Sequence, residues 1–139
     1  MTGKIFISHA HKDKPVADKF VKLLRLGCEL TTNDIKYTSD SSTGIRTGQK
    51  NFIDDLLEGI RTSPVVIFLL SPNFYNSVFC VSELGATWGL DKEIYPILLP
   101  NFSMNTVQDT LQVTQKGYID DKKCLDDLRA HLEIRLLHV

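Results

Sequence analysis

The residues of this chain that could do chemistry are one carboxylate on a predicted helix and a serine-histidine pair after the first apolar run. Glu83 shares a helix face with Phe79, which comes four residues earlier, and with Thr87 one turn later. Ser8 and His9 directly follow the apolar run near the start of the chain. A carboxylate of this kind can stabilise positive charge on a ligand, although composition alone favours a solvated helix glutamate.

Several other kinds of site are excluded by the motifs that the chain lacks. Neither G-x-G-x-x-G after the first strand nor G-x-x-x-x-G-K-[ST] occurs, so a dinucleotide fingerprint and a P-loop are unsupported. A phosphate-accepting receiver domain needs acidic residues where this chain has Ser8, His9 and Ser71. The three cysteines lie too far apart for a disulfide framework or a zinc site, and no histidine near Cys80 supports a nucleophile there.

Length and charge define the class of protein. The chain has 139 residues, of which 42% are hydrophobic and 24% charged, which predicts one globular domain over residues 1–139. Sixteen basic residues against seventeen acidic residues argue against a nucleic-acid partner. No apolar run approaches the roughly 18 residues of a membrane span, and no signal peptide precedes the first strand. We therefore expect a cytoplasmic domain without membrane contact, either complete or part of a longer protein.

Short apolar runs alternate with segments of helical periodicity. A candidate cap at Asp13 and a candidate stop at Gly27 bound the first helix. Small residues of a later helix are expected to pack closely on the sheet; these are Ser82, Gly85, Ala86 and Gly89. The predicted strands are 5–7, 34–38, 65–70, 94–99 and 117–119, and the later predicted helices are 52–60, 77–90 and 122–137.

Repeated strand-helix units of this length predict an α/β fold with right-handed crossovers. We expect a flavodoxin-like three-layer sandwich, with a five-stranded parallel sheet in the order 2-1-3-4-5 and helices on both faces. The topological switch point then lies at the carboxyl ends of strands one and three. Ligand chemistry is expected near residues 8–11, near Ser71, and beneath the polar loop from Ser39 to Gln49.

Four motifs in this order resemble a Toll/interleukin receptor-like (TIR) domain of the bacterial type. They are Ile5-Phe-Ile-Ser-His-Ala10 with Asp13, the loop ending Gly44-Ile-Arg-Thr-Gly48, the strand Val65 to Ser71, and Ser77-x-Phe-Cys-x-x-Glu-Leu84. Each motif alone is weak, but four in register are specific. The resemblance covers about residues 4 to 99, and the last predicted helix is compatible with it.

The resemblance implies a function and a set of site residues. Many bacterial and plant TIR domains cleave NAD, and the family's catalytic glutamate falls on Glu83. Substrate contacts are expected from Ser8, His9, Ala10, Gly48 and Phe79, with NAD as substrate and with neither a cofactor nor a metal. For three of these residues a structural role stays open: His9 as a loop histidine bonded to backbone, Gly48 as a conformational glycine, and Phe79 as a partly buried aromatic.

One carboxylate suffices for this chemistry. The nicotinamide of NAD is already a cationic leaving group, so breaking its bond to ribose needs no general acid. The transition state resembles an oxocarbenium ion, and an ionised glutamate beside the ribose stabilises its developing charge. The family often has Trp where this chain has Phe79, and some members use that aromatic to direct cyclisation. The resemblance therefore leaves both ADP-ribose and a cyclic product open.

The expected protein is thus an NAD glycohydrolase or cyclase. It would act as the N-terminal effector module of a bacterial anti-phage system, joined to a ligand-sensing domain and activated by self-association through the loop 39–49. The rival hypothesis is a non-catalytic TIR scaffold that recruits other TIR domains. A flavodoxin-like binder of small ligands is a third hypothesis, and no motif supports it.

Overall fold

A parallel sheet forms the centre of the molecule. The computed structural model describes residues 5–28, 30, 34–39, 58–90, 94–100, 102–103 and 117–133. The strands lie in the order β2-β1-β3-β4-β5, and each pairs in parallel with its neighbours. Their bounds are β1 Ile5–His9, β2 Ile35–Ser39, β3 Val65–Leu70, β4 Ile94–Leu98 and the two-residue β5 Gly117–Tyr118.

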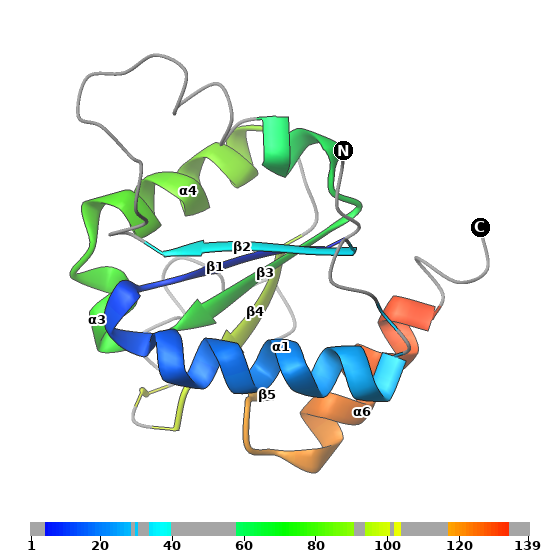
Figure 1. Ribbon diagram of the computed structural model, residues 1–139. Helices are drawn as coiled ribbons and strands as arrows, with labels where there is room; N and C mark the ends of the chain where they lie inside the picture. Colours follow the sequence, from blue (N-terminus) through cyan, green and yellow to red (C-terminus); the bar gives the residue numbers. More distant parts are fainter. Residues whose placement is uncertain are drawn as a thin grey trace.

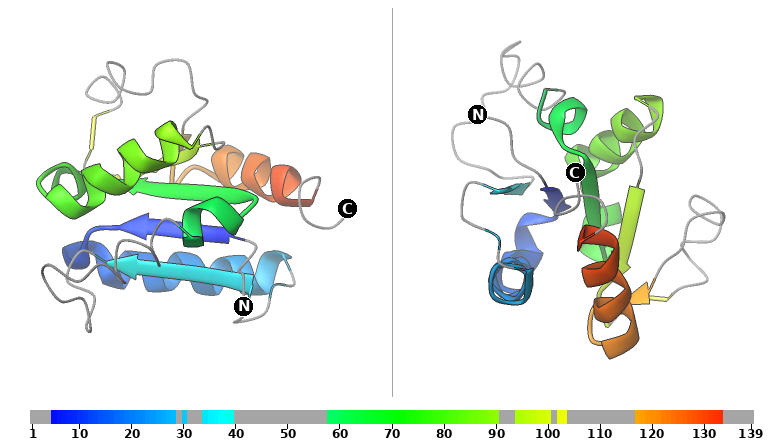
Figure 2. Two further views of the ribbon diagram at one scale, coloured as in Figure 1. Left: turned by 90° about the horizontal axis from the view of Figure 1, so that it is seen from above. Right: turned by 90° about the vertical axis from the view of Figure 1, so that its right-hand side faces the viewer.

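Helices cover both faces of this sheet, as Figures 1 and 2 show. On one face lie α1 (Lys14–Cys28) and α6 (Lys122–Leu132), whose apolar residues join one core cluster with alternate residues of the strands. On the other face lie α3 (Pro72–Tyr75), α4 (Val78–Gly89) and the helical residues 58–62. The expected α/β architecture with a parallel sheet between helices is therefore present.

The middle strands explain why two cores form. Every residue of β1 and of β3 is buried, as a parallel strand covered on both faces requires. Successive side chains alternate, so Ile5 and Ile7 join the α1/α6 cluster while Phe6 joins the α4 cluster. The β3 run of six apolar residues is divided between the two clusters in the same way.

Two local expectations differ from the structure at the carboxyl ends of the strands. β1 continues through Ser8 and His9 instead of stopping before them, because the pairing with β2 extends to His9. The short helix α3 begins directly after β3, at Ser71-Pro72, whereas the first helix predicted after this strand starts at residue 77. Ser71 caps this helix by accepting a 3.0 Å hydrogen bond from the Phe74 backbone N–H, and proline fits the first turn.

The expected close packing of small residues on the sheet is wrong. Ser82, Gly85 and Gly89 are exposed and Ala86 is half-buried, because the larger residues of α4 occupy its inner face. Among the described residues, no atom lies within 4 Å of a Cβ built at Gly85 or at Gly89. These glycines therefore face open space instead of the sheet.

Some expectations lie outside the described residues. They concern the loop 40–49, the first part of the predicted helix 52–60 and the end of the predicted helix 122–137. Within the described part of the chain, no helix has the length and apolar character needed to cross a membrane.

Candidate functional site

Glu83 lies on the inner face of α4, against the sheet. Ser77 begins this helix, and its side chain accepts a 3.2 Å hydrogen bond from the Cys80 backbone N–H. The residues of α4 that face the sheet are Cys80, Glu83, Leu84 and Thr87, and all of them are buried. Glu83 itself is completely buried, so a simple solvated glutamate is excluded at this position.

A hydrogen bond from β1 orients the Glu83 carboxylate. The Ser8 hydroxyl donates to Oε1 of Glu83 over 2.5 Å, joining two residues that are 75 positions apart. Both side chains are completely buried, and hydrogen bonds to a carboxylate are stronger than those between neutral groups. Ser8 is the penultimate residue of β1, so this contact lies at the carboxyl end of a central strand, where open α/β sheets bind ligands.

The other residues predicted to contact the substrate at this edge lie on different faces of the sheet. Because side chains alternate along β1, His9 points to the α1 face of the sheet, opposite to Ser8. Ala10 packs in the α4-side cluster with Phe6, and Phe79 is half-buried against the same cluster. Ser8, Ala10 and Phe79 therefore lie on the Glu83 side of the sheet, and His9 does not. Gly48 lies outside the described residues.

A second buried carboxylate, Asp13, joins the two loops at the same edge of the sheet. It ends the short 3-10 helix η1 (His11–Asp13), which connects β1 to α1. Its oxygens accept hydrogen bonds from the Ser71 hydroxyl and, over 2.9 Å, from the Asn73 side-chain amide. Asp13 thus ties the connection after β1 to the connection after β3.

The role of Asp13 was not found by sequence reasoning, which treated it as a helix cap. Among the described residues, the hydrogen bonds to its carboxylate come from the α3 region, 58 and 60 positions further along the chain. The signal that could have revealed it is the switch-point rule itself, because Asp13 and Ser71 follow the two strands that meet there.

The cysteines show no sign of a nucleophile. All three are buried thiols outside disulfide bonds, and burial raises the pKa of the Cys28 and Cys124 thiols. Cys80 is completely buried within the α4-side cluster, as a structural cysteine would be. In the part of the chain that the structure describes, no group of three or more His, Cys, Asp or Glu is placed to hold a metal ion.

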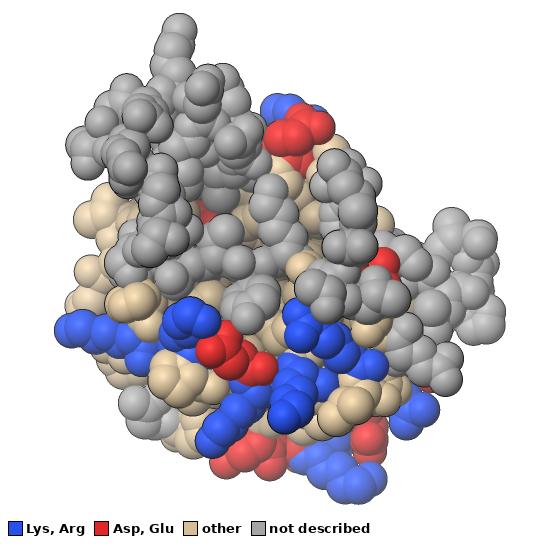
Figure 3. Space-filling view, viewed as in Figure 1, with Lys and Arg blue, Asp and Glu red and all other residues tan. Residues whose placement is uncertain are grey.

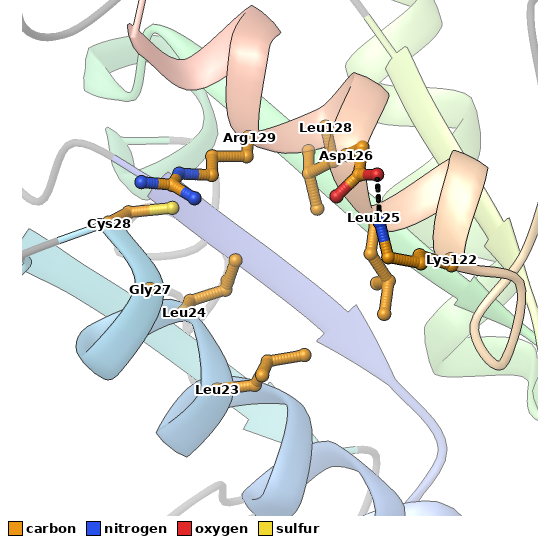
Figure 4. Close-up of a pocket in the computed structure, with 9 residues that line it drawn as sticks. All are labelled: Leu23, Leu24, Gly27, Cys28, Lys122, Leu125, Asp126, Leu128 and Arg129. Atoms are coloured by element: carbon orange, nitrogen blue, oxygen red, sulfur yellow. Dashed lines mark hydrogen bonds and ion pairs between the residues drawn. The ribbon is translucent and has the colours of Figure 1, made fainter.

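An apolar groove lies on the other face of the sheet, between α1 and α6 (Figure 4). Its volume is about 230 Å³, and leucines from both helices line it together with Cys28. At its rim Lys122 and Asp126 form an ion pair over 3.0 Å. The sheet separates this groove from Glu83, so the groove is no part of the Ser8–Glu83 site.

The fold and the site define a class: an α/β domain with a parallel sheet whose buried carboxylate lies at the carboxyl end of a central strand. The TIR domain family matches residues 5–133, so the chain belongs to this family. The Bacillus subtilis protein YddK, described as uncharacterized, is 39% identical over 131 residues. That match covers 94% of this chain, which spans 45% of the length of YddK.

Comparison with solved structures gives two TIR domains. The TIR domain of the Toll-related receptor TRR-2 from Hydra magnipapillata has a TM-score of 0.61 at 22% identity, covering 94% of this chain and 95% of that one. The TIR domains of the activated Roq1 resistosome have a TM-score of 0.47 at 15% identity, covering 97% and 84% of the two chains. The Hydra domain supports the TIR fold for this chain.

Proposed function

We propose that this domain cleaves the bond between nicotinamide and ribose in NAD, with Glu83 as the carboxylate that stabilises the developing positive charge. The single observation that carries this proposal is the buried Ser8–Glu83 contact at the carboxyl end of β1. Burying a carboxylate is costly unless it is hydrogen-bonded, and enzymes accept this cost where a charge has to act. Glu83 is also the residue that matches the family's catalytic glutamate.

The ring of Phe79 is a candidate contact for the substrate. It comes one turn before Glu83 on α4 and is half-buried, so part of its ring remains available for stacking. Ala10 and Ser8 lie on the same side of the sheet. Whether water or a group of the same molecule captures the ribose decides between ADP-ribose and a cyclic product.

The burial of Glu83 has a kinetic consequence. NAD reaches this carboxylate only when the groups that cover it move aside, so the competent arrangement is a minority state of an isolated copy. The apparent affinity then falls by the competent fraction. Specific activity should therefore be low in dilute protein and should rise with protein concentration as copies associate.

We further propose the biological setting that the family resemblance suggests. The domain would serve in the cytoplasm as the effector of a bacterial anti-phage system, joined to a ligand-sensing domain that triggers its assembly. The length of YddK beyond the matched region is consistent with an additional domain in such proteins.

A second candidate function, a non-catalytic scaffold, is favoured by one specific observation. A fully buried glutamate held by a serine can be a structural group that fixes α4 on β1, with no substrate involved. This hypothesis predicts that the protein associates with TIR domains but leaves NAD intact.

The test separates the two functions. Concentrated protein is incubated with NAD, and nicotinamide, ADP-ribose and cyclic ADP-ribose are resolved by chromatography. Glu83→Gln keeps the side-chain shape and the acceptor for Ser8, so a folded variant should lose cleavage by about 100-fold or more. The matched control is Glu58→Gln, an exposed carboxylate that should leave cleavage unchanged. Unchanged turnover in folded Glu83→Gln would refute the mechanism. If the unaltered chain and the Glu58→Gln control also leave NAD intact, the scaffold hypothesis is supported.

A further inference from the structure

The groove between α1 and α6 is lined by apolar side chains from both helices. Leu24 and Leu128 are buried and form its floor, whereas Leu23 is 47% exposed and forms part of its wall on α1. Leu125 is half-buried and lines the α6 side (Figure 4). The volume of about 230 Å³ is therefore apolar space that a ligand can reach from the solvent.

The α1 wall of this groove has a gap at Gly27, in the last turn of the helix. Among the described residues, no atom lies within 4 Å of a Cβ built there, and the φ of Gly27 is not positive. The backbone therefore does not require glycine, which is less favourable than alanine in a helix. The missing side chain leaves room in the groove that a larger residue would fill.

A cation with unused donors lies at one end of the groove. Figure 4 shows the Arg129 guanidinium extending from α6 toward Cys28 of α1. Burial raises the pKa of the Cys28 thiol, and the positive charge of Arg129 opposes this rise. The Nε of Arg129 pairs with Glu133 over 3.5 Å, and its two terminal nitrogens make no hydrogen bond to a described residue. Because an arginine fork matches the geometry of a carboxylate, this end is suited to an anion.

The other end of the groove is unfavourable for an anion. Lys122 pairs with Asp126 over 3.0 Å, so its charge is balanced, and the Asp126 carboxylate repels a second negative group. The surroundings as a whole attract anions, because α1 and α6 carry seven basic and three acidic residues in a chain whose net charge is -1. Figure 3 shows Lys and Arg side chains gathered over α1. A ligand with one anionic end should therefore place that end at Arg129.

We propose that this groove binds a free fatty acid of medium chain length, with its alkyl chain along the leucines and its carboxylate on the Arg129 guanidinium. A methylene group takes about the 30 Å³ of a water molecule, so the groove has room for about eight of them. A lipid with two chains is too large for this space, and so is a helix of another protein, which is about 10 Å across. The apolar lining stabilises the chain, and the single anionic end sets its direction.

This site is separate from the proposed NAD site. The sheet lies between the groove and Glu83. Binding of the fatty acid is measured without NAD, and NAD cleavage is measured without a fatty acid. The proposed function and this inference can therefore fail independently.

The experiment follows the backbone amide signals of isotopically labelled protein by NMR during a titration with octanoate, a straight-chain carboxylate of the proposed length. We expect saturable shifts confined to the last turns of α1 and to α6, with a dissociation constant between about 0.1 and 1 mM for a ligand of this size. 1-Octanol has the same chain without the charge. It should bind about 5-fold more weakly, because it cannot form a charge-assisted pair with Arg129.

Gly27→Leu fills the groove and should weaken octanoate binding by about 10-fold or more. The matched control is Gly85→Leu, which adds the same side chain to a glycine of α4 that has equally open surroundings. This control should bind octanoate as the unaltered chain does.

Arg129→Gln should weaken octanoate binding by about 5-fold and leave 1-octanol binding unchanged. Its matched control is Arg61→Gln, which alters an exposed arginine paired with Glu58 on the other face of the sheet. Octanoate affinity should not change in this control.

Several results would each overturn the proposal. They are the absence of saturable binding up to about 10 mM octanoate, equal affinity for octanoate and 1-octanol, and unchanged octanoate binding in folded Gly27→Leu. Loss of binding in folded Gly85→Leu would also overturn it, because the groove would then not be the site. If Gly27→Leu does not fold, Arg129→Gln decides: a loss for octanoate alone supports the proposal, and an unchanged affinity refutes it.

Discussion

The two faces of the sheet bury different chemistry. The core on the α1/α6 face is built almost entirely from aliphatic residues and cysteines, with Phe20 as its buried aromatic. The core on the α4 face contains Phe6, Phe68 and Phe74, and Glu83 and Ser8 are buried beside it. The α4 face thus holds a carboxylate whose burial needs compensation. The proposed NAD site therefore belongs to the α4 face.

The largest loss of stability is expected at Asp13, which ties the connection after β1 to the connection after β3. Asp13→Ala removes the acceptor of two hydrogen bonds and strands the Ser71 hydroxyl and the Asn73 amide. It should lower the free energy of unfolding by about 3 kcal/mol, measured by urea denaturation. Asp18→Ala, which removes an exposed carboxylate paired with Lys14, should cost about 0.5 kcal/mol or less. Equal costs for the two variants would show that the buried tie does not stabilise the fold.

Neighbouring residues of β1 offer a direct comparison of the faces. Ser8→Ala removes the donor to Oε1 of Glu83 and should cost about 2 kcal/mol, because the buried carboxylate loses this hydrogen bond. Ile7→Val trims one methylene group on the other face and should cost about 1 kcal/mol. Urea denaturation measures both, and NAD cleavage is assayed under conditions where both variants are folded.

The expected difference between these variants lies in activity. Ser8→Ala should lower NAD cleavage well beyond its loss of stability, since the Glu83 carboxylate loses the hydrogen bond that Ser8 donates to it. Ile7→Val should leave cleavage unchanged. An equal loss of activity in the two folded variants would mean that Ser8 acts through stability alone.

Replacing a glycine of α4 and a glycine of β5 by alanine should change the free energy of unfolding in opposite directions. Gly85→Ala should raise the free energy of unfolding by about 1 kcal/mol, because alanine favours the helix and the site is open. Gly117→Ala should lower it by about 2 kcal/mol, since the new Cβ would lie 2.8 Å from the Cys124 Sγ and 2.9 Å from its Cβ. Thermal and urea unfolding check both, and a stabilising Gly117→Ala would contradict the packing between β5 and α6.

Much of the fold could be predicted because its signals are local. Val65 to Leu70 is apolar at every position, and β3 has the predicted bounds. The strand that was predicted too short is β1, because Ser8 and His9 are polar and polar residues usually mark a strand end. Their burial depends on α4 and on the strands beside them, which local periodicity does not contain.

The candidate site could be predicted only in part. The switch-point rule placed chemistry at the ends of strands one and three, and the structure joins Ser8 to Glu83 there. It did not predict that His9 faces the other way, which follows from β1 continuing for two more residues. The hydrogen bond from Asn73 to Asp13 joins residues 60 positions apart. Such a contact produces no periodic pattern in the sequence, so only the structure reveals it.

The order of the elements along the chain has a consequence for synthesis on the ribosome. Leu24 and other apolar residues of the inner face of α1 share one core cluster with Leu128 and Leu132 of α6, so the first long helix is covered by the last one described. In addition, β1 pairs with β2 and β3, both of which follow it in the chain. The emerging chain therefore carries apolar surface until its final third is made, which gives chaperones a long interval in which to bind. The contact between α1 and α6 cannot form before residues 122–132 have been made.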